Sequence, residues 1–193
     1  IYYFFGSYSV LTNLIFIVAI FLILQCLLDA KRSLYKNKRF EYPRIISHLG
    51  FALLVLFIGI NHQYSLEVDF NLKVGENKKV NNYEIYFENI EIKQNKNYQS
   101  VVGNFKLTDR KKNLVQYLDP EIRVYSDPET LTYEAAIKSK ITSDFYLTMS
   151  NVSRSEYYNI KFQNKPFMMW IWISAFIIAL GGFVQLMLKK NEI

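Results

Sequence analysis

An uncharged apolar segment of twenty residues, Ser9–Leu28, constrains this chain more than any other feature of its sequence. As a helix, the segment would extend about 30 Å, which matches the hydrocarbon core of a bilayer. It is longer than the core of a secretory signal peptide, and no basic region precedes it. A run of four aromatic residues lies before it, as in an interfacial aromatic belt: Tyr2, Tyr3, Phe4 and Phe5. We therefore predict that residues 1–30 form a first transmembrane helix with interfacial aromatics.

Two further apolar segments predict two more transmembrane helices, at residues 44–61 and 166–188. A proline stands at the head of each, Pro43 and Pro166, where the missing N–H costs a helix nothing. The chain therefore reads as a three-span α-helical membrane protein embedded in a lipid bilayer.

The charge distribution predicts how these spans are oriented. The net charge is +6, but residues 63–165 hold 15 basic and 14 acidic residues, so the excess lies elsewhere. It lies in the loop 31–43 and the tail 189–193, and positively charged loops remain on the cytoplasmic side. We read the excess as an orientation signal rather than a nucleic-acid-binding surface. The prediction is a bacterial inner membrane, with the mitochondrial inner membrane as the alternative.

Residues 62–165, between the second and third spans, are then expected in the periplasm or its equivalent. Short runs rich in Tyr, Phe, Ile and Val alternate there with polar residues, and Gly, Asn, Asp or Pro separate the runs. We predict a small β-rich domain, either a barrel or a sandwich. One helical turn is predicted near Tyr133–Lys138.

His48 is the first candidate for chemistry, because ionisable residues inside membrane spans are costly and usually functional. Its imidazole can ligate a metal, most readily the iron of a haem held between helices. Gly50, two residues on, removes side-chain bulk and would let a flat macrocycle approach the helix. The alternative is a histidine near the interface that hydrogen-bonds a neighbouring helix.

No catalytic residue is predicted, because the chain lacks the motifs of phosphate-binding, metalloprotease and serine-hydrolase sites. His62, at the outer end of the second span, is interpreted as a solvated interfacial residue. Five acidic residues accompany Arg123 and nearby lysines, a pattern that favours a solvated or ion-paired surface over a calcium site. They are Asp119, Glu121, Asp127, Glu129 and Glu134.

Several segments, taken in order, resemble the C-terminal region of CcmF, the haem-lyase subunit of cytochrome c maturation. The matching segments are His48–Ala52, Asn97-Tyr98, Pro120–Tyr125, Leu131–Ile137, Asp144–Leu147, Lys165–Trp172 and Ala179–Gly182. Each is short, but their order and spacing cover residues 43–188, and the three-span topology agrees with them.

The resemblance implies a haem lyase that joins haem to the CXXCH motif of apocytochrome c outside the membrane. It also implies a second, b-type haem inside the membrane, bound by two histidines from different spans, one of which His48 matches. That haem is thought to keep the iron being delivered reduced. The family's tryptophan-rich haem-handling motif lies N-terminal to the matched region, and this chain has only two tryptophans. The second haem ligand is also absent.

We therefore expect this chain to be the C-terminal part of a haem-lyase subunit and not to catalyse attachment alone. The partners implied are the missing N-terminal part of the subunit, the protein that presents the apocytochrome thiols, a haem chaperone and apocytochrome c. The competing hypothesis is a membrane-anchored periplasmic β-domain that acts as a ligand-binding or sensor module. His48 discriminates between them, because a sensor needs no histidine within a membrane span.

Overall fold

The computed structural model describes residues 10–35, 41–111, 114–151 and 156–190. The aromatic belt predicted at residues 2–5 lies outside the described residues, as do the middle of the predicted basic loop (36–40) and residues 191–193 of the tail. The chain divides into two compact units. The helical unit comprises residues 1–65, 140–143 and 165–193, and the β unit comprises residues 66–139 and 144–164.

The helical unit contains three helices that are long and apolar enough to cross a membrane, as predicted. They are α1 (Val10–Tyr35), α2 (Tyr42–Tyr64) and α3 (Met168–Lys190). Helix α1 extends beyond the predicted span, so residues 31–35, predicted as loop, are helical. The side of the membrane on which each end lies stays a prediction.

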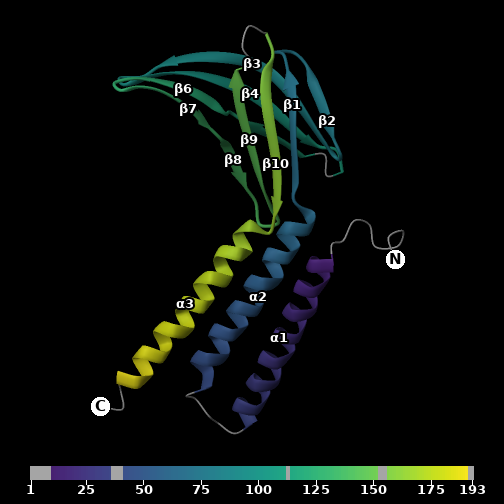
Figure 1. The fold of residues 1–193 in the computed structure, drawn as a ribbon, viewed down its shortest axis with the longest axis vertical. Helices are drawn as coiled ribbons and strands as arrows, with labels where there is room; N and C mark the ends of the chain where they lie inside the picture. Colours follow the sequence, from purple (N-terminus) through teal and green to yellow (C-terminus); the bar gives the residue numbers. More distant parts are fainter. Residues whose placement is uncertain (1–9, 36–40, 112–113, 152–155, 191–193) are drawn as a thin grey trace. The chain divides into compact units, whose positions relative to one another are not determined.

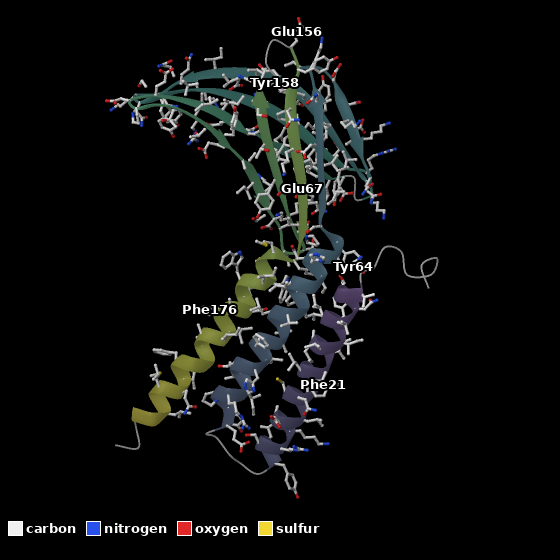
Figure 2. The ribbon with its side chains drawn as sticks, in the orientation of Figure 1. Phe21, Tyr64, Glu67, Glu156, Tyr158 and Phe176 are labelled. Carbon is white, nitrogen blue, oxygen red and sulfur yellow. The ribbon has the colours of Figure 1, made fainter. Side chains whose placement is uncertain are left out.

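Helix α2 lies between α1 and α3 (Figure 1). Helix α1 buries a row of small residues at seven-residue spacing, Thr12, Ala19, Cys26 and Ser33. Small side chains let helix backbones approach closely where no hydrophobic effect drives association. The larger residues of the outer helices, such as Phe21 and Phe176, project from the bundle (Figure 2) and are 57% and 64% exposed. Most of each outer helix is therefore free to contact lipid or other helices.

The contact between α2 and α3 is tighter. A Cβ placed on Gly181 would lie 2.7 Å from the Pro43 carbonyl oxygen and 2.8 Å from the Ser47 nitrogen. The Ser47 hydroxyl donates a hydrogen bond to the carbonyl oxygen of Ile178, 3.2 Å away. A glycine and a serine thus allow two backbones to meet, as is usual between membrane helices.

The β unit is a sandwich of two antiparallel sheets, which decides between the two predicted architectures (Figure 1). One sheet has the order β1-β10-β9-β8, and the other has the order β2-β3-β4-β6-β7 with β5 also paired to β4. The strands are β1 (Leu66–Leu72), β2 (Asn77–Val80), β3 (Tyr83–Gln94), β4 (Tyr98–Asp109), β5 (Leu114–Leu118), β6 (Glu121–Ser126), β7 (Glu129–Glu134), β8 (Ala136–Ser139), β9 (Ser143–Asn151) and β10 (Tyr158–Pro166).

The core between the sheets is aromatic. Phe87 and Phe105 come from the larger sheet, are fully buried and stack with their ring centroids 4.1 Å apart. Alternate residues of the smaller sheet complete the core, including Phe145, Leu147 and Phe162. The alternation of apolar and polar residues in the sequence follows from this arrangement, because one face of each strand is buried and the other is solvated.

The helical turn predicted near Tyr133–Lys138 is wrong. Tyr133 pairs with Ile122 in the β6–β7 ladder, and Ile137 pairs with Tyr146 in the β8–β9 ladder. In this segment the chain passes from β7 of one sheet to β8 of the other. Two ladders of hydrogen bonds outweigh the helix propensity of so short a segment.

Tyr83 makes the stability of the β unit sensitive to high pH. Burial raises the pKa of its phenol above the ordinary 10.0, and the nearby Asp109 raises it further. Its oxygen accepts a hydrogen bond from Asn164 Nδ2 at 3.0 Å. The folded unit holds this proton more tightly than the unfolded chain. The stability that it contributes is therefore fully present below pH 10.0 and is lost as pH rises through the raised pKa.

We expect Tyr83→Phe to lessen the loss of stability between about pH 9 and pH 12. Hydrogen exchange of residues 66–164 in the full chain, in detergent micelles, would measure this loss. Tyr117→Phe is the matched control, because Tyr117 is 55% exposed. Equal alkaline losses in the two variants would contradict the assignment to Tyr83.

Candidate functional site

His48 lies in the second turn of α2, and Pro43 lies in the first turn. Its side chain is exposed in the chain as it stands. Within the described residues, the imidazole makes no hydrogen bond or ion pair. Both ring nitrogens are therefore available to a metal or to another polar group.

A cavity of about 280 Å³ adjoins His48 within the helical unit. Its lining comes from two helices: Leu22, Gln25, Cys26 and Asp29 of α1, and His48 and Phe51 of α2. Leu22 and Phe51 give it apolar walls beside the imidazole. A free imidazole against apolar walls fits one axial ligand of a haem, whose macrocycle is flat and apolar.

Gly50 contacts α3 rather than the cavity beside His48. A Cβ at this position would lie 2.9 Å from both the backbone nitrogen and Cγ1 of Ile178. The structure therefore gives Gly50 a role in packing α2 against α3. Its predicted contact with a macrocycle stays a prediction.

His62 is exposed in the last turn of α2. It is fourteen residues from His48, or roughly 21 Å along the helix axis at ~1.5 Å per residue. The two histidines of the chain cannot ligate one iron at that distance. Any second histidine ligand must come from outside this sequence.

Among the described acidic residues of this cluster, Glu121 and Glu134 form ion pairs with Arg123. Arg123 Nε lies 2.8 Å from a Glu121 carboxylate oxygen, and its Nη1 lies 3.9 Å from Glu134. The guanidinium also lies 5.0 Å from the centroid of the Tyr98 ring. The hydrogen bond to Glu121 raises the pKa of Arg123.

A second cavity, of about 390 Å³, lies in the β unit, where the β3–β4 and β6–β7 hairpins turn. Polar and exposed side chains such as Gln94, Gln99 and Glu129 line most of it, beside Tyr98 and Tyr125. The apolar enclosure typical of a small-molecule site is absent from this described region.

The α1 lining of the cavity beside His48 was not predicted. The predicted first helix, residues 1–30, included these lining residues, but none of them was assigned to a site. The signal was present, because Leu22, Gln25, Cys26 and Asp29 follow the spacing of one helical face. Which face of α1 meets α2 is set by packing, so this lining could be recognised only in the structure.

These features define a membrane protein with three apolar helices and a β-sandwich that falls, in sequence, between the second and third of them. The family model described as the CcmF C-terminal beta-sandwich matches residues 63–166. The chain belongs to this family.

Relatives of the chain include two proteins described as cytochrome c-type biogenesis protein CcmF. The protein from Escherichia coli K12 is 29% identical over 143 residues, which cover 74% of this chain and 22% of the relative. The protein from Haemophilus influenzae is 29% identical over 150 residues, which cover 77% of this chain and 23% of the relative. The chain thus spans less than a quarter of the length of the curated relatives that it matches.

A solved structure described as cytochrome c heme lyase CcmF has a similar fold. Its TM-score to this chain is 0.68, at 17% identity. The match covers 91% of this chain and 30% of the solved one. The fold described here therefore occurs within a longer chain.

Proposed function

We propose that this chain serves as the C-terminal part of a haem-lyase subunit in cytochrome c biogenesis, with His48 as an axial ligand of a b-type haem in the membrane. One observation carries the proposal: a histidine without a partner among the described residues stands on a membrane helix beside a partly apolar cavity. Such a residue is costly in a bilayer unless it is used. Membership in the CcmF family supports a role in cytochrome c biogenesis, since the relatives of this chain are described as biogenesis proteins of that cytochrome.

The residues of this chain would act by holding and positioning. His48 would supply one imidazole nitrogen to the iron, while Leu22 and Phe51 would exclude water from that side. Bound there, the haem would supply one-electron transfer. The second ligand would come from the remainder of the subunit, since His62 is too far along α2.

The β unit would lie in the periplasm and support covalent attachment of haem to apocytochrome c. The basic residues beside the first two spans favour this orientation. Its partners would be the thiol-presenting protein, the haem chaperone and apocytochrome c. No residue of the β unit is assigned a bond-making role.

The test is a reduced-minus-oxidised absorption spectrum of membranes that contain this chain together with the rest of the subunit. We expect His48→Ala to abolish the b-type haem signal, because an imidazole ligand cannot be replaced by a methyl group. His62→Ala is the matched control and should keep the signal. A b-type signal that persists unchanged in His48→Ala would show that His48 is not a ligand.

A further inference from the structure

The cavity beside His48 is lined by one face of α1 and one face of α2. On α1 it is lined at positions 22, 25, 26 and 29, the spacing of one helical face, and on α2 at positions 48 and 51, one turn apart. The two faces are therefore directed at the same cavity. Three of the four α1 residues are polar or polarisable, although the helix is otherwise mostly apolar.

Asp29 is the strongest hydrogen-bond acceptor in this cavity. A carboxylate accepts a stronger hydrogen bond than an amide or a thiol does. Asp29 is half-buried, whereas Gln25 is exposed. Within the described part of the chain, Asp29 makes no hydrogen bond or ion pair. An acidic group on the inward face of a membrane helix requires a polar partner, and His48 is the one titratable base that lines this cavity.

We propose that Asp29 is the positioning residue for His48, accepting a hydrogen bond from the imidazole N–H that is not directed at the iron. This inference depends on the proposed ligation by His48. Metal-bound histidines almost always donate their second N–H to a carboxylate, carbonyl or water, which fixes the tautomer and the ring orientation. Asp29 supplies that carboxylate from the neighbouring helix, so α1 contributes to the haem site without contributing a ligand.

The hydrogen bond has a measurable electronic consequence. A carboxylate that accepts a hydrogen bond from the imidazole N–H makes the ligand more basic. A more basic ligand stabilises ferric over ferrous iron. Asp29 therefore lowers the reduction potential of the haem. Removing the carboxylate shifts the potential upward, and removing every acceptor at this position also weakens haem binding, by about tenfold.

The experiment is a redox titration of the b-type haem in native membranes that contain the complete subunit. Asp29→Asn keeps the shape but replaces the carboxylate by a weaker acceptor, so we expect retained haem with a higher potential. Asp29→Glu restores a carboxylate and should return the potential toward that of the native protein. Asp29→Leu should lower haem occupancy per subunit, as measured from the absorption signal against immunodetected protein.

Gln25→Leu is the matched control, because it removes another polar side chain from the same cavity. We expect it to shift the potential less than Asp29→Asn does, because no hydrogen bond to His48 is lost. The inference is overturned if Asp29→Asn has the native potential, if Asp29→Glu fails to restore it, or if Gln25→Leu shifts it as much. His48→Ala separates the two proposals: persistence of the haem there refutes ligation. If His48→Ala loses the haem but the Asp29 variants keep the native potential, only the positioning role of Asp29 is refuted.

Discussion

Replacing Gly181 with leucine is expected to separate α3 from α2 and to destabilise the helical unit by about 3 kcal/mol or more. Even the first carbon of a side chain would lie 2.7 Å from the Pro43 carbonyl oxygen and 2.8 Å from the Ser47 nitrogen. Both are backbone atoms, so no side-chain rotation can relieve the overlap. The helices must move apart, and the Ser47 hydroxyl then loses its hydrogen bond to Ile178.

The matched control is Gly182→Leu, the next residue of the same helix. Nothing lies within 4 Å of a Cβ at that position, so leucine there has no backbone to displace. It should be neutral or stabilising, because leucine favours helices more than glycine does. Resistance of the chain to SDS, followed by the fluorescence of Trp170 and Trp172 in α3, would compare the two. Equal losses of resistance would contradict a packing role specific to Gly181.

Phe105→Ala is expected to cost the β unit about 3–5 kcal/mol, a large part of the stability of a typical domain. Phe105 has no exposed surface and stacks on Phe87 at 4.1 Å between centroids. Its removal leaves a cavity where the two sheets meet. Dense packing of the surrounding side chains prevents them from filling that space.

Hydrogen exchange localised to residues 66–164, measured on the full chain in micelles, would report this loss. Tryptophan fluorescence during urea unfolding would report this loss poorly, because both tryptophans belong to α3. Tyr117→Ala is the control on the same sheet, since Tyr117 is 55% exposed, and it should cost about 1 kcal/mol or less. Native-like protection of β3 and β4 in Phe105→Ala would show that this core is not cooperative.

The helices and strands that could be predicted from sequence were those whose residue pattern is set by contact with lipid or water. Hydropathy predicted the three helices because lipid imposes one length and one chemistry on a span. Alternation predicted the strands because a sandwich buries one face of each. The segment Tyr133–Lys138 was misassigned because its local propensity favours a helix, whereas pairing with residues distant in the chain decides its structure.

Only part of the candidate site could be predicted from the sequence. His48 was found because an ionisable group within an apolar span is conspicuous. Asp29 was missed because its relevance depends on which faces of α1 and α2 meet. The predicted role of Gly50 illustrates the same limit: proximity in sequence to His48 suggested a shared environment, yet the two residues are directed at different neighbours. Helix rotation about its axis is set by packing, which hydropathy does not encode.

The pairing of β1 with β10 constrains the order in which this protein can be made. Leu66 pairs with Asn164 and Leu72 with Tyr158, so β1 cannot pair until β10 has been synthesised. The ribosome must therefore deliver almost the whole domain before the smaller sheet can close, and contacts of such high sequence separation form slowly. During that interval β1 is an open edge, and translation proceeds directly into the apolar residues of α3. Insertion of the third span and completion of the sandwich are consequently linked in time, and a chain that stalled between them would expose an unpaired strand to aggregation.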